Sequence, residues 1–269
     1  MLSQNQVKHI TALKLKKFRE EKGQFIAEGH KLVMDLVNSE YEIAGIFASA
    51  EWIVANLSVV RAKKIPVFET LPREMLRISA LSTPSPVLAI VNIPGAAFTM
   101  LSFHLAAVSL ILALDDIRDP GNLGTIIRIA DWFGIETILC SESCVDTYNP
   151  KVVQASMGSI ARVKVIRCNL AEAISGFSDA ASKSAGNITL PVYGTFLEGD
   201  PVFAQKLDDH GIILIGNESR GISPDLVPFV TQKLCIPSFG SPAAGKAESL
   251  NASVATAIIC AEFRRKLST

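Results

Sequence analysis

Residues 108–133 read VSLILALDDIRDPGNLGTIIRIADWF, and this stretch decides the fold class. It opens with an apolar run of strand length, Val108–Leu114. The polar loop Asp119–Gly124 follows, and Thr125 is expected to begin a helix because threonine is a favourable helix-capping residue. A buried strand, a loop and a helix in this order predict one unit of a parallel α/β sheet.

The same alternation continues to the end of the chain. Strand-like runs and helical segments follow one another, which predicts an α/β fold with a mostly parallel sheet covered by helices on both faces. The expected strands are 137–140, 163–166, 189–193, 212–215 and 233–236. The expected helices are 151–160, 169–177, 201–208, 224–230 and 249–266.

A smaller α/β domain is expected at residues 1–95. Residues 5–22 have an approximate apolar stripe and predict one helix. Short strands at 24–28, 43–48, 66–68 and 87–91 alternate with helices at 29–38, 51–56 and 72–79. Prolines and Pro94-Gly95 punctuate the region that follows, so 96–106 is expected to be a linker and 107–269 the second domain.

Composition narrows the class of protein. The chain has 269 residues, of which 49% are apolar and 19% charged, so a substantial core is expected rather than disorder. The five cysteines form no CxxC pair and suit reduced core thiols in a cytoplasmic protein. The four histidines are scattered, so no metal site is expected. The apolar stretch 96–114 contains polar residues and predicts a linker and a buried strand rather than a membrane span.

The zero net charge conceals an uneven distribution. Residues 1–100 carry a net charge of +3 and residues 101–269 a net charge of −3. Basic residues gather near the N-terminus, which could indicate a contact with phosphate groups. The alternative is a solvated helix face with pairs such as Lys16–Glu20 and Lys17–Glu21, and charge alone favours this second interpretation.

Three motifs follow apolar strands, where open parallel sheets bind ligands. They are Asp119–Arg128, Ile215–Ile222, and Ile236-Pro237 followed by Glu248–Ala255. The first two, taken alone, are also compatible with ordinary polar loops, and the third is the most specific. Together, in order and spacing over roughly 108–266, they resemble the SpoU (TrmH-type) RNA ribose methyltransferases of the SPOUT superfamily. Residues 24–34 resemble, less specifically, the L30-like substrate-binding domain that precedes many of these catalytic domains.

The resemblance implies a trefoil-knotted catalytic domain that methylates a ribose 2′-hydroxyl of RNA with S-adenosyl-L-methionine and without a metal. Ribosomal RNA is favoured over transfer RNA as the substrate. The implied catalytic residues are Asn122, Arg128, Glu218, Ser249 and Asn251. The implied cofactor-binding residues are Thr195, Gly216, Asn217, Ile236 and Leu250. The expected RNA-binding residues are Lys14, Lys16, Lys17 and Arg19.

Two departures and one alternative accompany the resemblance. Ser219 stands where the family usually has glycine, and the connection 238–247 is about five residues longer than the usual one. These departures support the alternative of an RNA-binding SPOUT relative with weak or no activity, whereas the retained motif residues favour an enzyme. The family role of Arg128 is either to hold RNA phosphate or to act as a base; arginine normally stays charged, which favours the first.

An assembly is also expected. The SpoU resemblance implies a homodimer that forms through the C-terminal domain. The predicted helix 249–266 is apolar on more than one side, whereas packing on one face of a sheet needs only one apolar side. The alternative is a helix buried within one subunit.

Overall fold

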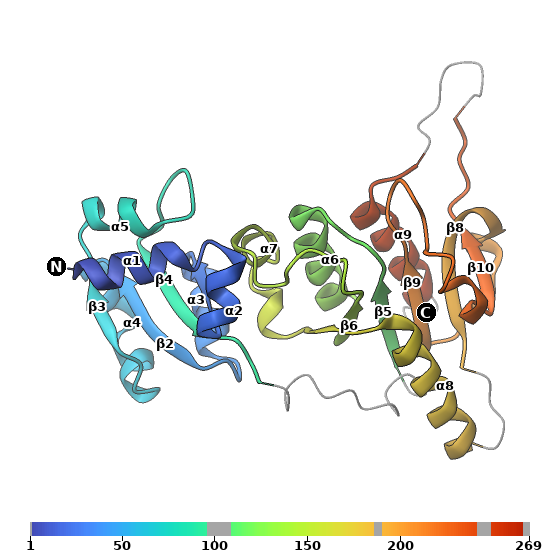
Figure 1. Cartoon of the computed structure of the whole chain (residues 1–269), viewed down its shortest axis with the longest axis horizontal. Helices are drawn as coiled ribbons and strands as arrows, with labels where there is room; N and C mark the ends of the chain where they lie inside the picture. Colours follow the sequence, from blue (N-terminus) through green and yellow to red (C-terminus); the bar gives the residue numbers. More distant parts are fainter. Residues whose placement is uncertain (1, 96–108, 186–189, 241–248, 266–269) are drawn as a thin grey trace. The chain divides into compact units, whose positions relative to one another are not determined.

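The computed structural model describes residues 2–95, 109–185, 190–240 and 249–265, without the side chains of 181–185. The chain divides into two compact units, coloured along the sequence in Figure 1. The first unit comprises Met1–Thr99 and Asp146–Arg162; the second comprises Met100–Val145 and Val163–Thr269. The segment Asp146–Arg162 therefore packs with the N-terminal part, a grouping that the sequence pattern did not indicate.

The first unit contains a four-stranded sheet in the order β1-β4-β2-β3. Strand β4 is antiparallel to both of its neighbours, and β2 and β3 are parallel. The predicted strands are confirmed nearly to the residue, because each is a short apolar run between turn-forming residues. The bounds are β1 (Gln24–Glu28), β2 (Ile43–Ala48), β3 (Val67–Glu69) and β4 (Val87–Asn92).

Helices cover the sheet of the first unit. Ile10 and Leu13, in and just after α1, pack with Met75 and Ile78 of α5 against Ile26 and other sheet residues. The single helix expected at 5–22 is wrong, because α1 ends at the fully buried Leu13 and α2 begins after an extended Leu15. The bounds are α1 (Gln4–Ala12), α2 (Lys16–Lys22), α3 (His30–Val37), α4 (Ala50–Ala62) and α5 (Pro72–Ile78).

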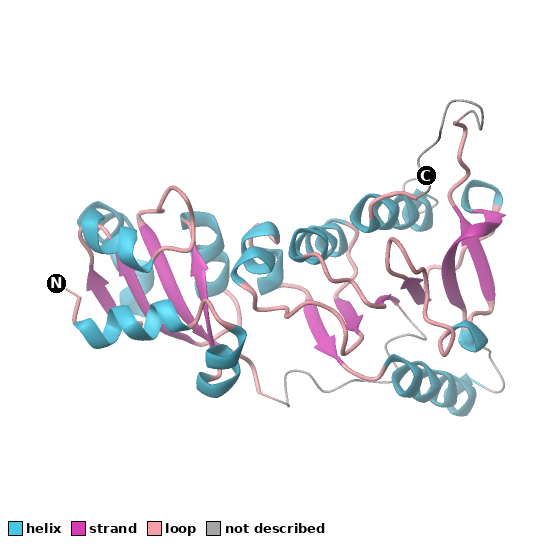
Figure 2. Cartoon of the chain, turned by 45° about the horizontal axis from the view of Figure 1, so that its top comes forward, coloured by secondary structure: helices cyan, strands magenta, loops and turns pink. Residues whose placement is uncertain are grey.

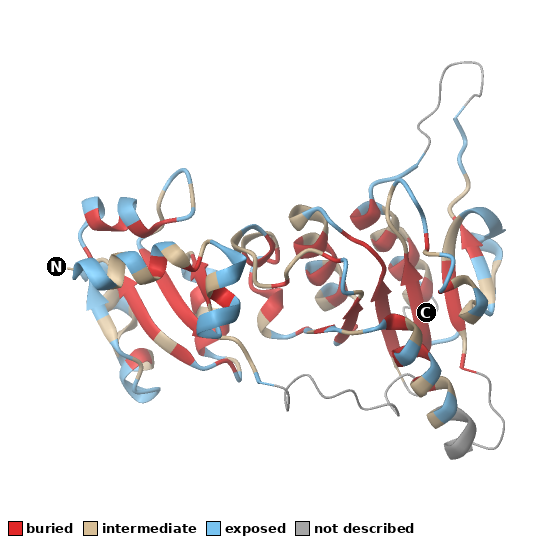
Figure 3. Ribbon diagram, in the orientation of Figure 1, coloured by how far each residue is buried: buried red, intermediate tan, exposed pale blue. Residues whose placement is uncertain are grey.

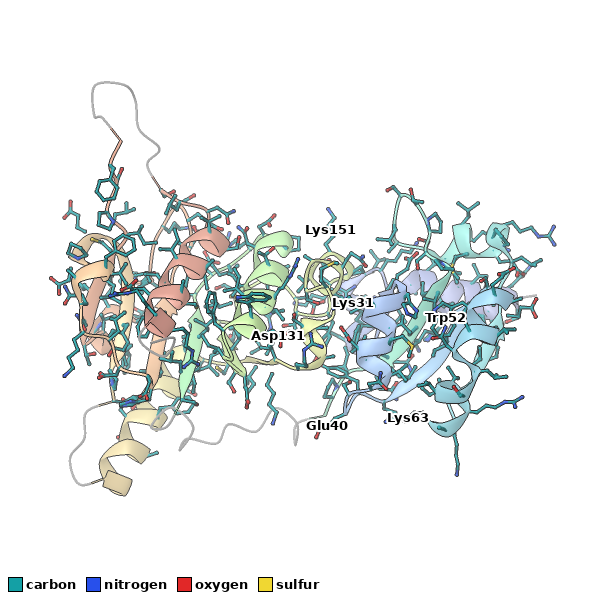
Figure 4. The ribbon with its side chains drawn as sticks, turned by 180° about the vertical axis from the view of Figure 1, so that it is seen from behind. Lys31, Glu40, Trp52, Lys63, Asp131 and Lys151 are labelled. Atoms are coloured by element: carbon teal, nitrogen blue, oxygen red, sulfur yellow. The ribbon has the colours of Figure 1, made fainter. Side chains whose placement is uncertain are left out.

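The segment Asp146–Arg162 carries α7 (Pro150–Ala155) and is held by several contacts to the first unit. The ring of Tyr148 packs on that of Phe25, with 4.7 Å between centroids. Lys31, on α3, donates a hydrogen bond of 3.1 Å to the carbonyl of Met157; Figure 4 labels Lys31 on α3 and Lys151 on α7. The segment thus completes the first unit although strands of the second unit precede and follow it.

The second unit is built on six strands in the order β10-β8-β9-β5-β6-β7, and every pair is parallel. This confirms the predicted parallel α/β sheet; the trefoil knot remains a prediction. The helix expected at 201–208 is wrong, because β8 continues to Pro201 and only a short 3-10 turn follows. The bounds are β5 (Leu110–Leu114), β6 (Thr137–Cys140), β7 (Lys164–Arg167), β8 (Val192–Pro201), β9 (Gly211–Ile215) and β10 (Gln232–Cys235).

Helices lie on both faces of this sheet, as Figure 2 shows. On one face α8 (Leu170–Ala185) packs against alternate residues of the central strands, such as Ile111 and Leu214. On the other face α6 (Pro120–Trp132) and α9 (Ala252–Arg264) pack side by side. Strands β5 and β9 are buried along their whole length, visible in red in Figure 3, which explains their uninterrupted apolar sequences.

The expected linker 96–106 lies outside the described residues. The boundaries of independently folding domains at 95 and 107 therefore stay a prediction. No helix in the described part of the chain is long and apolar enough to cross a membrane.

Candidate functional site

Helix α6 begins at the first motif. The Asp119 side chain caps it by accepting a hydrogen bond of 2.8 Å from the Asn122 amide, and Pro120 occupies the first helical position. The helix therefore starts five residues before Thr125, where the sequence had placed its beginning. As a consequence, Asn122 lies in the first helical turn and not in a loop.

Helix α9 begins at the third motif. Asn251 caps it, since its Oδ1 accepts hydrogen bonds from the amides of Ser253 (2.9 Å) and Val254 (3.3 Å). Ser249 is exposed and lies two residues before this cap.

A chain of side-chain hydrogen bonds joins the three motifs. Asn251 Nδ2 donates to Asn122 Oδ1 at 2.8 Å, and Asn122 Nδ2 donates to Glu218 Oε1 at 2.5 Å. We call Asn251, Asn122 and Glu218 the Asn–Asn–Glu chain. Its members are 129 and 96 residues apart in sequence, so the fold brings three of the five predicted catalytic residues together.

The two helices that carry the asparagines run parallel. Their N-terminal ends meet through the Asn–Asn–Glu chain, and at the other end Arg264 donates from Nε to the carbonyl of Phe133 (2.9 Å) and from Nη2 to that of Gly134 (3.2 Å). Both helices thus point their N-terminal ends at the carboxyl edge of the sheet, the edge where the strands end. Helix N-termini carry partial positive charge, which favours negative charge in a bound ligand.

Arg128 lies on α6, about 9 Å along the helix axis from Asn122. It is exposed and forms no hydrogen bond or ion pair with another described residue. An arginine in this state is charged and available to an anionic substrate.

The loop after β9 is held by Asn217. Its Nδ2 donates to the Asp116 carbonyl at 2.9 Å, and its Oδ1 accepts from the amides of Ser219 (2.9 Å) and Arg220 (3.2 Å). A Cβ atom at Gly216 would overlap with the backbone of Gly221 and Ile222. The glycine is therefore required by the packing of the loop on itself.

The substitution at Ser219 is tolerated for a local reason. Within the loop the left-handed conformation falls on Gly221, with φ of 70°, and Ser219 is not among the described residues with positive φ. Ser219 donates its amide to the Asn217 side chain. A glycine is therefore not needed at this position for the loop to turn.

The remaining predicted cofactor residues come from the same edge of the sheet. Thr195 Oγ1 donates to the Leu214 carbonyl at 3.1 Å, Ile236 is half-buried directly after β10, and Leu250 precedes the cap of α9 with 44% of its surface exposed. Phe239 is exposed as well. Exposed apolar side chains beside chain turns fit a flat adenine ring. Most of the connection 238–247 lies outside the described residues.

The predicted RNA-binding residues of the first unit differ in their availability. Lys14 Nζ donates to the Ser79 carbonyl at 2.5 Å, Lys16 forms an ion pair of 3.5 Å with Glu20, and Lys17 is exposed. Arg19 is buried: it donates to Asp146 Oδ2 from Nε (2.9 Å) and Nη2 (2.5 Å), and to the Leu13 carbonyl at 2.8 Å. This is a correction, because a guanidinium with these partners is not available to RNA phosphate.

Other features do not coincide with the predicted site. A cavity of about 320 Å³ in the first unit is lined by Met75, Leu76, three prolines and hydroxyl side chains, and by none of the predicted residues. The described residues contain no group of three or more potential metal ligands.

All five cysteines are free thiols. A hydrogen bond from Cys140 helps to lower the pKa of Cys144 to about 7, and the same interaction raises the pKa of Cys140.

Comparison with solved structures defines the class of protein. A rRNA methyltransferase from Sinorhizobium meliloti with bound AdoMet is 30% identical, with a TM-score of 0.83 over 99% of this chain and 97% of that one. A TrmH-family protein from Porphyromonas gingivalis is 34% identical, with a TM-score of 0.82 over 99% of both chains. The fold is that of the SPOUT TrmH-type methyltransferases, as predicted.

The sequence comparisons give the family. The profile described as the SpoU rRNA methylase family matches residues 109–261, and that of an MRM3-like substrate-binding domain matches residues 4–89. The 23S rRNA (guanosine(2553)-2′-O)-methyltransferase RlmP of Bacillus subtilis is 28% identical over 260 residues, 96% of this chain and 95% of that protein. The chain belongs to the SpoU rRNA methylase family. The predicted enzyme class, an RNA methyltransferase, is confirmed.

Proposed function

We propose that this protein transfers a methyl group from S-adenosyl-L-methionine to the 2′-hydroxyl of a ribose in ribosomal RNA. The family membership and the similarity to RlmP over nearly the whole chain support the reaction. The observation that carries the proposal is the Asn–Asn–Glu chain, which holds the three family motifs at one edge of the sheet near the exposed Arg128. The site therefore has the side chains that would align the cofactor with the ribose of the RNA.

The chemistry needs alignment more than covalent help. S-adenosyl-L-methionine, when bound, supplies a methyl group on a positively charged sulfur. The Arg128 guanidinium orients the RNA strand through its phosphate. As the oxygen–methyl bond forms, the methyl–sulfur bond breaks and the hydroxyl proton passes to solvent. Glu218 is held by Asn122, and Asn122 by Asn251, so the loop after β9 and the start of α9 are fixed relative to α6. This rigidity keeps the RNA hydroxyl in line with the methyl group.

The cofactor site is proposed at the turns that contain Thr195, Gly216, Asn217, Ile236 and Leu250. Leu250→Glu tests it, because a carboxylate beside the adenine should weaken binding about tenfold or more. Leu197→Glu is the matched control, since Leu197 is an exposed leucine of the same unit. Calorimetry with S-adenosyl-L-methionine should show weaker binding only for Leu250→Glu. Equal affinities for the two variants would place the site elsewhere.

The alternative function is an RNA-binding protein without transferase activity. Its support is limited to the departures at Ser219 and 238–247, and Ser219 does not disturb the loop. Calorimetry with S-adenosyl-L-methionine and methyl transfer to bulk ribosomal RNA separate the two functions. Binding of RNA with neither cofactor binding nor transfer would favour the alternative.

Ribosomal RNA is proposed as the substrate, with the first unit as its principal contact. This unit carries 14 basic and 10 acidic residues, a net charge of +4, against −4 for the second unit. Lys14, Lys16 and Lys17 remain the proposed contacts after Arg19 is removed. Mapping of 2′-O-methylation in RNA from cells with and without the gene identifies the nucleotide. Loss of base methylation alone, with every ribose methylation retained, would overturn the assignment.

We also propose that the protein acts as a homodimer through its second unit, in the cytoplasm. Trp132 at the C-terminal end of α6 is 84% exposed and Val254 near the start of α9 is 48% exposed, two exposed apolar side chains on adjacent helices. The free thiols suit a reducing compartment. Light scattering should give a dimer, and Trp132→Glu with Val254→Glu should give a monomer. A wild-type monomer at micromolar concentration contradicts the dimer.

A further inference from the structure

Asp116 has an unusual backbone conformation directly after β5. Its φ angle is 56°, in the left-handed region that few residues other than glycine adopt, although aspartate does so more readily than most. Its backbone is fixed on both sides: its amide donates to Ser141 Oγ at 2.9 Å, and its carbonyl accepts from Asn217 Nδ2 at 2.9 Å. The direction of its side chain is therefore set by two other loops of the carboxyl edge.

The Asp116 carboxylate is buried and binds two arginines. Arg118 Nε donates to Oδ1 at 2.7 Å, and Arg220 Nη2 lies 3.5 Å from Oδ2. The carboxylate is 10% exposed, whereas the Arg118 and Arg220 side chains are 59% and 62% exposed. Asp116, Arg118 and Arg220 together carry one net positive charge, and both guanidinium-bearing side chains are largely exposed to solvent.

The two arginines come from the two loops that build the catalytic site. Arg118 immediately precedes Asp119, which caps α6, and Arg220 lies two residues after Glu218 of the Asn–Asn–Glu chain. Nothing in the local sequence pattern shows that residues 116 and 220 meet.

We propose that Arg118 and Arg220 form a clamp for a phosphodiester of the RNA strand beside the methylated ribose, and that Asp116 is the positioning residue of this clamp. The proposal rests on the proposed function and adds a specific substrate contact to it. Two arginines held in place lose less conformational freedom on binding phosphate than two free ones. Their other guanidinium donors have no partner among the described residues and can form charge-assisted hydrogen bonds with a phosphate.

The exposure of the pair favours RNA over the carboxylate of the cofactor. Small-ligand sites bury most of the ligand, whereas backbone phosphates of a nucleic acid are met by side chains on an open surface. Arg118 and Arg220 have more than half of their surface in solvent. The ligand is therefore assigned as a phosphate group of a long, solvent-exposed strand.

The test compares single arginine substitutions in the full-length protein. Arg118→Gln and Arg220→Gln should each weaken binding of protein-free ribosomal RNA from a strain lacking the gene about tenfold. The double variant should flatten the salt dependence of RNA binding by about 0.7 per lost contact. Arg265→Gln is the control, because Arg265 is equally exposed and ion-paired but lies at the far end of α9.

Asp116→Gly isolates the positioning role. Glycine adopts the same φ without strain, so the fold should be kept while the arginines lose their anchor. RNA binding should weaken several-fold with an unchanged melting temperature and unchanged affinity for S-adenosyl-L-methionine. Unaltered RNA affinity in both arginine variants would overturn the clamp, as would a loss confined to cofactor affinity. Because the readout is RNA binding, absence of methyl transfer in the wild type would count against the proposed function and not against the clamp.

Discussion

Two arginines predicted to meet RNA, Arg128 and Arg19, have opposite surroundings. Arg128 on α6 is exposed and free of partners among the described residues, whereas Arg19 on α2 is buried with Asp146 and the Leu13 carbonyl. The first was singled out by its spacing from Asn122 and Gly124 within a motif, the second by its place in a basic segment. Motif spacing thus selected an exposed arginine and the basic segment a buried one, because charge density does not show which side chains face solvent.

The largest effect is expected for Arg128→Ala. Removing the exposed guanidinium should lower methyl transfer by about 10² to 10³-fold, since a preorganised charge next to the reacting groups is lost. Affinity for S-adenosyl-L-methionine should stay within a few-fold. Single-turnover transfer and calorimetry measure the two quantities. An equal loss of cofactor binding would mean that Arg128 faces the cofactor.

Arg19→Met tests whether the buried Arg19 stabilises the fold and does not bind RNA. The substitution leaves the largely buried Asp146 carboxylate without its partner and should lower the free energy of unfolding by about 3 kcal/mol. Lys16→Met, which breaks the exposed pair with Glu20, should change it by less than about 0.5 kcal/mol. Urea denaturation measures both. Unchanged stability with weakened RNA binding in Arg19→Met would reverse our correction.

Asn122→Asp sharpens the role of the Asn–Asn–Glu chain. It places a second carboxylate against Glu218, and the repulsion should raise the pKa of the pair above its ordinary range. Below that pKa a shared proton restores the hydrogen bond, so transfer by the variant, relative to wild type, should recover as the pH falls. Asn122→Ala has no such proton to gain and serves as the control. A pH-independent ratio for Asn122→Asp would show that the hydrogen bond to Glu218 is not needed.

The smallest effect is expected for Lys16→Gln combined with Lys17→Gln. Both side chains are exposed, so RNA binding should weaken a few-fold and its salt dependence should flatten by about 0.7 for each lost phosphate contact. The salt dependence of RNA affinity is the measurement. An unchanged slope would mean that these lysines belong to a solvated helix face, the interpretation that charge alone favoured.

Local patterns predicted most of the strands. Strands β1, β2 and β6 match the expected ranges to the residue, because short apolar runs between turn residues have few alternatives. The start of α6 was misplaced although its signals, an aspartate cap and a following proline, stand in the sequence. Residues Asp119–Gly124 were interpreted as a loop, and this concealed the capping pattern.

Contacts between distant residues could not be predicted from local patterns. The family resemblance selected Asn122, Glu218 and Asn251, yet their hydrogen bonds to one another follow only from the fold. The ion pair between Arg19 and Asp146 joins residues 127 apart in sequence. The sequence around neither residue indicates this pairing. The ion pair between Asp116 and Arg220 likewise joins distant residues and has no sign in the local sequence.

The membership of Asp146–Arg162 in the first unit has a consequence for how the protein can be divided. The chain passes between the two units three times, after residues 99, 145 and 162, and not once. A fragment that ends at residue 95 would lack Tyr148 and Asp146, and would leave Phe25 uncovered and Arg19 unpaired. A fragment that starts at 107 would carry α7 without the surface on which it packs. The two units are therefore expected to unfold in one cooperative transition, and neither should be stable when produced alone.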